Sequence, residues 1–168
     1  MTGREGRLTI EGERAVLAFE RRLSFPIDVV WSAITDPDER EKWFGVTSID
    51  AREGGSIEMV ATGPPLPPKR KRMTGRILVW DPPNVLEHEW KQPIVEDGVV
   101  RYELTADGDG TLLRFSHRGL GVRKASGFRG GTHAFLDRLE AYLAGDELPE
   151  WTMRRLEVIE STGVGDEH

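Results

Sequence analysis

Four polar side chains in this sequence stand where they could act on a ligand: His88, Tyr102, His117 and Thr132. Each shares its strand parity or helical face with apolar neighbours, so we expect all four to point inward. Imidazole, phenol and hydroxyl groups can orient a ligand or move a proton in an apolar enclosure. A buried histidine can equally be satisfied by internal hydrogen bonds. We therefore expect ligand contacts from these residues, assign no catalytic residue, and favour a binding protein over an enzyme.

Other kinds of chemistry find no support in the sequence. The chain has no cysteine, which excludes a thiol nucleophile, disulfides and thiolate metal sites. It also lacks paired histidines at i, i+4, a G-x-S-x-G elbow, a P-loop and a dinucleotide fingerprint. We expect neither a metal nor a cofactor.

Charge and length limit the class of protein further. A formal net charge of −6 argues against general affinity for nucleic acid, whose phosphates require a basic surface. The polar first twelve residues contain no signal peptide or membrane anchor, so we expect a cytoplasmic protein without a membrane partner. We divide the 168 residues into a flexible segment over 1–13, one domain over 14–145 and a partly disordered extension over 146–168.

Periodicity predicts the elements that must position the polar groups. A first strand over 14–24 is followed by two short helices, one beginning near Pro26 and one beginning after Asp36. Six further strands, separated by Gly-, Asp- and Pro-containing turns, are expected at 46–51, 55–61, 73–80, 85–90, 98–106 and 111–118. A long helix then ends near Gly145. The pattern predicts an α+β domain in which a curved antiparallel sheet wraps around the long helix.

Several ordered sequence blocks resemble one family of proteins. They are F-P-I-D-V-V-W-S-A-I-T-D-P-D (25–38), K-W-F-G (42–45), E-G-G-S-I-E-M (53–59), G-R-I-L-V-W-D-P-P (75–83), L-E-H-E-W (86–90), G-T-L-L-R-F-S-H-R-G-L (110–120) and F-L-D-R-L-E-A-Y-L (135–143). Together they resemble the SRPBCC proteins of the START-like, birch-pollen-allergen superfamily, in the branch similar to the activator of the heat-shock-protein ATPase. The resemblance implies a helix-grip fold and says less about function, because these blocks are structural.

In a helix-grip fold the space between the long helix and the sheet is the usual ligand cavity. We expect it to be lined by Met59, Met73, Ile77, His88, Trp90, Tyr102, Phe115, His117, Phe128, Thr132 and Phe135. Aromatic and thioether side chains of this kind suit an apolar or aromatic small molecule. The same residues could instead fill a closed core.

Three functions remain open at this point. The first is binding or sequestration of an apolar small molecule, including resistance to a polyketide-type natural product. The second, implied by the branch resemblance, is a partner-binding module of the heat-shock ATPase activator type, with a role in the stress response. The third is an enzyme that resembles polyketide aromatase/cyclases, with Tyr102, His88 and His117 as its polar groups. We favour the first.

The chain departs from the family pattern in three places. The segment 63–72 is rich in proline and cations and is expected to form a stiff solvated connection, or to guard the cavity or meet an acidic partner. Gly130 and Gly131 interrupt the long helix, which suggests a mobile gate, a later helix start or close packing. In the extension we expect a short helix after Pro149, an exposed Trp151 and disorder from residue 161. His133 is expected at the edge of the domain or in solvent.

Overall fold

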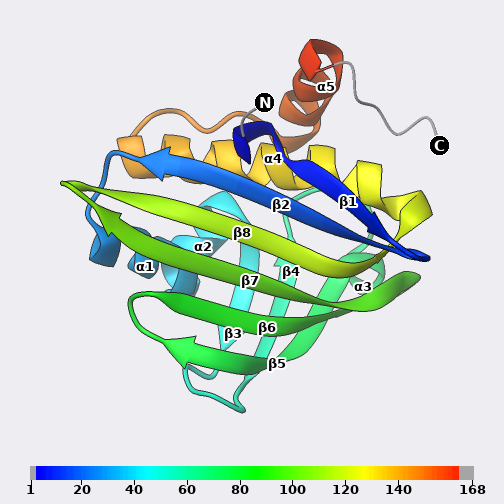
Figure 1. Cartoon of the computed structure of the whole chain (residues 1–168), viewed down its shortest axis with the longest axis horizontal. Coiled ribbons are helices and arrows are strands. Elements are labelled where there is room, and N and C mark those ends of the chain that lie inside the picture. Colours follow the sequence, from blue (N-terminus) through cyan, green and yellow to red (C-terminus); the bar gives the residue numbers. More distant parts are fainter. Residues whose placement is uncertain (1–2, 163–168) are drawn as a thin grey trace.

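The strands of the protein join into one antiparallel sheet. The computed structural model describes residues 3–162, and within them the strands are β1 (Arg7–Glu11), β2 (Arg14–Leu23), β3 (Gly45–Ile49), β4 (Ser56–Ala61), β5 (Arg72–Asp81), β6 (Val85–Gln92), β7 (Val95–Asp107) and β8 (Gly110–Gly121). Their order across the sheet is β1-β2-β8-β7-β6-β5-β4-β3 (Figure 1). The six strands expected after the two short helices are confirmed, with shifts of a few residues at their ends.

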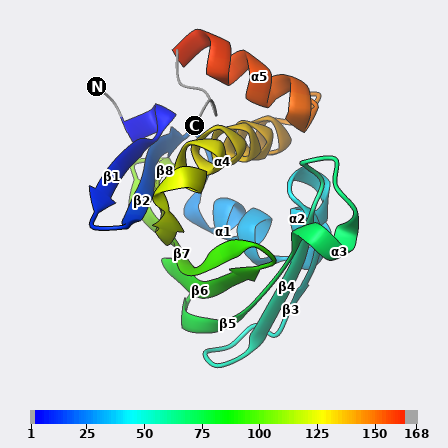
Figure 2. The same ribbon diagram turned by 90° about the vertical axis from the view of Figure 1, so that its right-hand side faces the viewer.

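The helices in the described residues are η1 (Gly3–Glu5), α1 (Ile27–Thr35), α2 (Pro37–Trp43), α3 (Pro68–Lys71), α4 (Val122–Ala144) and α5 (Trp151–Thr162). Of these, α1, α2 and α4 lie on the concave side of this sheet (Figure 2). Figure 2 shows the sheet curving around α4, with α5 on the outer side of α4. The helices α1 and α2 contact α4 and lie toward its C-terminal end (Figure 1). The predicted α+β helix-grip arrangement is confirmed. None of the described helices is both long and apolar enough to cross a bilayer.

Alternation along the strands places the core on the concave face. Ile57, Met73 and Leu104 have 1% exposure each, as their parity predicts. In β5 the register shifts between Ile77 and Val79, so simple alternation fails beyond that point. Beyond this bulge Trp80 packs against the core, with its ring 5.3 Å from that of Trp31 on α1.

The N-terminal end of the chain differs from its expected structure. Residues 7–11, expected to belong to a flexible segment, form β1, which pairs with β2 from Arg7↔Ala18 to Glu11↔Arg14. The hairpin turns at Gly12, whose φ of 67° is easily adopted by glycine. At the other end, the short helix expected after Pro149 is present as α5. The disorder expected near the C-terminus concerns mainly residues 163–168, which lie outside the described residues.

Glycines in α4 give α5 a place to pack. The helix begins at Val122, so the expectation of a start after the glycines is wrong. A Cβ on Gly131 would lie 3.0 Å from the Trp151 ring, and a Cβ on Gly63 would overlap that ring. Trp151 is therefore 93% buried rather than exposed, and its indole N–H donates to the Gly131 carbonyl oxygen at 3.1 Å. Close packing is the reason for the glycine at position 131.

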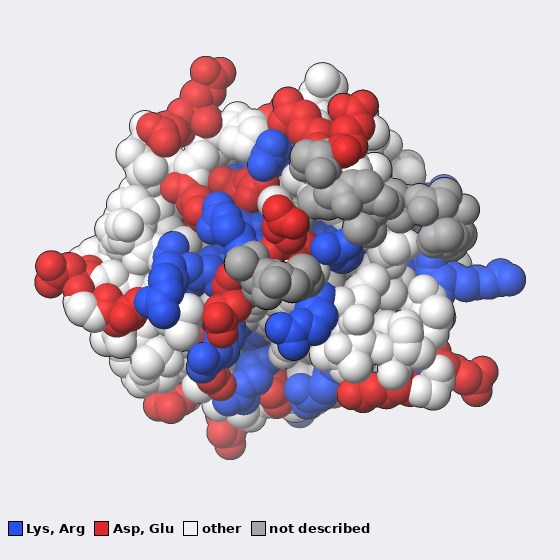
Figure 3. Space-filling model, turned by 45° about the horizontal axis from the view of Figure 1, so that its top comes forward, with Lys and Arg blue, Asp and Glu red and all other residues white. Residues whose placement is uncertain are grey.

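A network of ion pairs around Asp137 links three elements. Arg21 of β2, whose side chain is fully buried, donates from one nitrogen to Asp137 Oδ1 and Glu140 Oε2 of α4, each at 2.7 Å. Arg154 of α5 donates to Asp137 Oδ2 at 2.7 Å. His133 Nδ1 lies 3.0 Å from the same oxygen and its ring is buried, which corrects the expectation that His133 faces solvent. On this side of the molecule, cationic and anionic side chains are interspersed (Figure 3).

We predict that Asp137→Asn lowers the free energy of unfolding by about 3 kcal/mol, because it removes a buried charge that faces two guanidinium groups. Burial alone would raise the pKa of Asp137, but the His133 hydrogen bond and the charge of Arg21 hold that pKa well below its usual value. The matched control is Glu157→Gln, since Glu157 also pairs with Arg154 but is exposed. It should change stability by less than about 0.5 kcal/mol. Equal effects in urea denaturation would contradict the role given to Asp137.

Candidate ligand-binding site

A cavity of about 480 Å³ separates the N-terminal half of α4 from the sheet. Its walls come mainly from apolar side chains of the sheet, of α4 and of the end of α2, and Trp151 of α5 closes one part of it. The Trp151 ring packs against the ring of Phe135, with the two ring centres 5.6 Å apart, and both residues line the cavity. The volume falls in the range of small-molecule sites, about 300–1,000 Å³.

Most of the residues expected at this site lie there. The lining includes nine of them: Met59, Met73, Trp90, Tyr102, Phe115, His117, Phe128, Thr132 and Phe135. Ile77 and His88 are not part of the lining. These two are cross-strand partners on β5 and β6, with 1% and 0% exposure. An enzyme that uses Tyr102, His88 and His117 together would therefore lack one of its three polar groups at the cavity.

Sequence reasoning missed part of the lining. Trp43 and Phe44 at the end of α2 and Trp151 of α5 all contribute to the cavity wall. The apolar pair at the end of the second short helix was visible in the sequence as part of the K-W-F-G block. Trp151 could not be assigned, because its burial depends on the glycine seat in α4 and on the segment that contains Gly63.

Arg40 of α2 contacts side chains of the cavity wall without being part of the lining itself. This side chain is 1% exposed, donates to the Ile34 carbonyl oxygen at 2.8 Å and donates to the Tyr102 hydroxyl oxygen at 2.9 Å. Its guanidinium lies over the rings of Trp43, Phe44 and Tyr102 at 4.8–5.2 Å. Because the Tyr102 oxygen accepts from Arg40, the Tyr102 hydrogen can be donated to an acceptor in the cavity.

His117 is a polar group in an apolar part of the wall. Its ring lies 5.2 Å from Trp90 and 5.3 Å from Phe128, and its Nε2 is buried without a hydrogen-bond partner. Burial, together with the charge of His88, lowers the pKa of His117 to about 3. Burial also lowers the pKa of His88 to about 4, although a hydrogen bond with the Glu89 carbonyl partly offsets this effect. Both imidazoles are neutral at physiological pH, so the cavity interior carries no histidine charge.

The segment 63–72 belongs to the site. Gly63, Pro64 and Lys71 line the cavity, and Lys71 Nζ donates to the Pro64 carbonyl oxygen at 2.8 Å. The four residues before Arg72 form α3 rather than an extended connection. Across residues 3–162, His, Asp and Glu side chains do not gather in a group of three that could hold a metal ion.

We predict that acid destabilises the protein through these two histidines. In the unfolded chain their pKa is about 6.5, so below that value the unfolded state binds more protons and the folded state loses stability. Between pH 7 and pH 5 each histidine should cost about 2 kcal/mol. In urea denaturation at the two pH values, His117→Phe should therefore lose about 2 kcal/mol less than the wild type. The same loss in both proteins would show that His117 becomes protonated as easily in the folded state as in the unfolded chain.

Comparison with solved structures shows other proteins with the same fold. The crystal structure of CalU16 from Micromonospora echinospora is 29% identical, with a TM-score of 0.70 over 93% of this chain and 90% of that chain. A protein of unknown function from Enterococcus faecalis, EF2215, is 19% identical, with a TM-score of 0.72 over 94% and 90% of the two chains. DynU16, a protein of the dynemicin biosynthetic locus, is 23% identical, with a TM-score of 0.67 over 77% of this chain and 47% of that chain.

Sequence comparisons identify the family. A search of curated proteins found no match. The model of the family described as "Activator of Hsp90 ATPase homolog 1-like protein" matches residues 24–144, which include most of the sheet and all of α1, α2 and α4. This match covers well over half of the chain and agrees with the SRPBCC resemblance of the sequence blocks. The chain therefore belongs to the family of activator of Hsp90 ATPase homolog 1-like proteins.

Proposed function

We propose that the protein binds an apolar small molecule in the cavity between α4 and the sheet, and so carries or sequesters it. The observation that supports this proposal is the cavity itself, which leaves about 480 Å³ unfilled in an otherwise closely packed domain. Protein interiors rarely leave such a volume open. An apolar ligand would restore the dispersion contacts that the lining side chains lack.

The lining is suited to ligands with rings. Trp90 and Phe128 present their rings at nearly right angles, 6.3 Å apart, so an aromatic ligand can find both faces and edges. Met59 and Met73 are cross-strand partners, and their flexible thioethers can adapt to the shape of a ligand. The Tyr102 hydroxyl and His117 Nε2 would supply polar contacts to a carbonyl or hydroxyl group of the ligand.

The relatives suggest a narrower ligand class. DynU16 is a protein of the dynemicin biosynthetic locus and shares the fold of this chain. That setting supports a ligand of the polyketide type, which the protein would handle or sequester as part of natural-product resistance.

A second candidate is the binding of a protein partner. It is supported by the family description, which refers to an activator of the Hsp90 ATPase. Lys69 and Arg70 are exposed on α3 and would offer charge to an acidic partner surface. Co-purification with an Hsp90-type chaperone, weakened by replacement of both cations with Gln, would favour this candidate. No binding in either form would remove it.

We predict that N-phenyl-1-naphthylamine, an uncharged fluorescent dye, binds the wild type with micromolar affinity. Thr132 lines the cavity from α4, so Thr132→Trp would place an indole ring in the ligand volume. This variant should raise the dissociation constant for the dye by at least about tenfold. The matched variant Thr132→Val, which keeps the volume and removes only the hydroxyl, should change it by less than about twofold.

The stability of the same variants provides a second measurement. A side chain added to a filled core costs about 1–3 kcal/mol, whereas one added to open volume costs less. We therefore expect Thr132→Trp to unfold at nearly the same urea concentration as the wild type. Absence of dye binding together with a strongly destabilised Thr132→Trp variant would show that the cavity is closed and that the proposed function is wrong.

A further inference from the structure

The charged side chains that line the cavity, among the residues that the structure describes, all have the same sign. They are Lys71, Arg123, Lys124 and Arg155. The chain as a whole carries a formal net charge of −6, so composition alone does not explain four cations and no carboxylate at one cavity. A field of one sign beside an apolar wall attracts ligands of the opposite sign.

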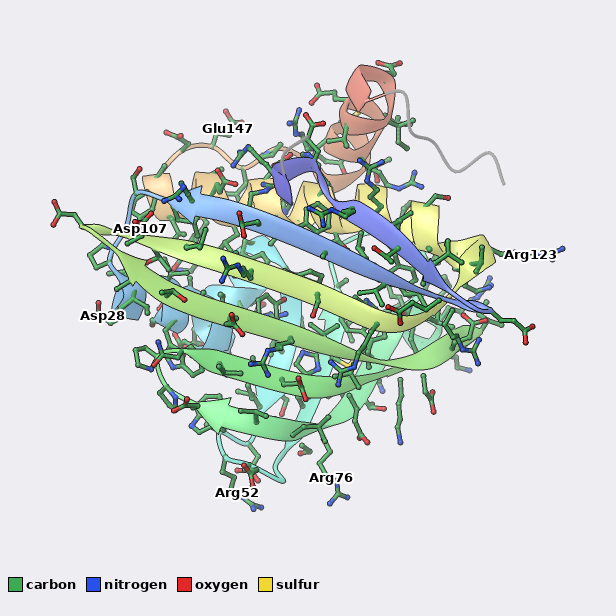
Figure 4. The ribbon with its side chains drawn as sticks, in the orientation of Figure 1. Asp28, Arg52, Arg76, Asp107, Arg123 and Glu147 are labelled. Carbon is green, nitrogen blue, oxygen red and sulfur yellow. The ribbon has the colours of Figure 1, made fainter. Side chains whose placement is uncertain are left out.

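Separate elements bring these cations to the cavity. Lys71 is the last residue of α3, Arg123 and Lys124 lie in the first turn of α4, and Arg155 lies on α5. Figure 1 shows α3 and the start of α4 at the same end of the molecule, and Figure 4 labels Arg123 at that end. In Figure 2, where this end faces the viewer, the two elements lie on opposite sides of it. We refer to this end of the cavity as the mouth.

The start of α4 is an unfavourable place for cations. The first turn of this 23-residue helix contains no acidic residue, and its N-cap, Gly121, has no side-chain hydrogen bond to offer. Arg123 and Lys124 therefore add positive charge to the positive end of the helix dipole. Glu96, which does not line the cavity, accepts the Gly121 N–H at its Oε1 at 3.1 Å. Backbone hydrogen bonds and the charge of Lys124 lower the pKa of Glu96, so its carboxylate offsets part of the positive charge at the start of α4. An anion inside the mouth would offset the part that faces the cavity.

Two of the cations are also partly removed from water. Burial lowers the pKa of Lys71 and the pKa of Arg155, so solvent compensates their charges incompletely. The Lys71 bond to the Pro64 carbonyl uses one of its three ammonium hydrogens. Arg155 lies over the Trp151 ring at 5.9 Å, which places its charge beside the apolar wall.

We propose that the ligand is an anionic amphiphile, whose apolar body occupies the cavity and whose single carboxylate, sulfonate or phosphate group is attracted to the mouth by the cations that line it there, Lys71, Arg123 and Lys124. This inference rests on the proposed function and specifies the chemical class of its ligand. The acidic group distinguishes this ligand from a neutral apolar molecule of the same shape.

Two dyes with the same ring system test the charge separately from the cavity. The dye 1-anilinonaphthalene-8-sulfonate differs from N-phenyl-1-naphthylamine by one sulfonate group. In the variant Arg123→Gln/Lys124→Gln we expect the dissociation constant of the sulfonate dye to rise about tenfold, and that of the neutral dye to change by less than about twofold. The wild type should bind the sulfonate dye more tightly than the neutral dye. This difference in dissociation constant should become smaller between 50 mM and 500 mM NaCl, because salt screens the charges at the mouth.

A matched control removes the same charge elsewhere. Arg52, in the turn between β3 and β4, and Arg76, on β5, lie away from Arg123 (Figure 4), and neither lines the cavity. Arg52→Gln/Arg76→Gln has the same net charge as the test variant and should leave both dissociation constants unchanged. The test variant should unfold at nearly the same temperature as the wild type, because it relieves positive charge at the start of α4 but also loses the attraction between Lys124 and Glu96.

The outcomes separate this inference from the proposed function. If the neutral dye binds, but the test variant and the control variant affect the sulfonate dye equally, the anionic class is wrong and the apolar cavity remains. If neither dye binds the wild type, or if Thr132→Trp blocks neither dye, the cavity is not the binding site and both proposals fail.

Discussion

The ion pairs of the Asp137 carboxylate are the interactions on which the arrangement of β2, α4 and α5 depends. The carboxylate joins β2, α4 and α5 through Arg21 and Arg154, and it does so in the C-terminal half of α4. In that half Leu139 is fully buried. In the N-terminal half Arg129 donates to the carbonyl oxygens of Glu5 and Gly6. Most of the α4 residues that line the cavity precede Asp137 by five residues or more, and Phe135 and Leu136 complete the α4 side of the wall.

The C-terminal extension completes the wall of this cavity. Arg154 fixes α5 to Asp137, and three residues earlier Trp151 enters the space left by Gly63 and Gly131. The same short helix carries Arg155, whose charge lies at the cavity. A segment outside the family match at 24–144 thus supplies both an apolar and a cationic part of the site.

Much of the fold could be predicted because local patterns control it. Alternation located the six strands after the short helices, and the αL conformation of Gly145 ended α4 where a glycine was expected to end it. The elements that were missed depend on contacts distant in sequence. The strand β1 is stabilised by pairing with β2, and its own pattern of exposed residues gives no period-two signal. The bulge in β5, which moves Trp80 toward the core, also has no local signal.

The site could be predicted to a similar degree and for a similar reason. Parity showed which side chains point inward, but not which of them reach the cavity, so Ile77 and His88 were expected in the lining although they are not part of it. Arg40 could not be assigned a role, because its partner Tyr102 is 62 residues away in sequence. Arg123 and Lys124 likewise could not be assigned to the cavity from the sequence, because their place in its lining depends on how α4 lies over the sheet.

The crystal structure of the protein grown with N-phenyl-1-naphthylamine tests the central claim most directly. Our account predicts electron density for the rings of the dye between the N-terminal half of α4 and the sheet, in contact with Trp90 and Phe128. A structure in which these two side chains close the cavity, with the dye absent or bound on the outer surface, would contradict it.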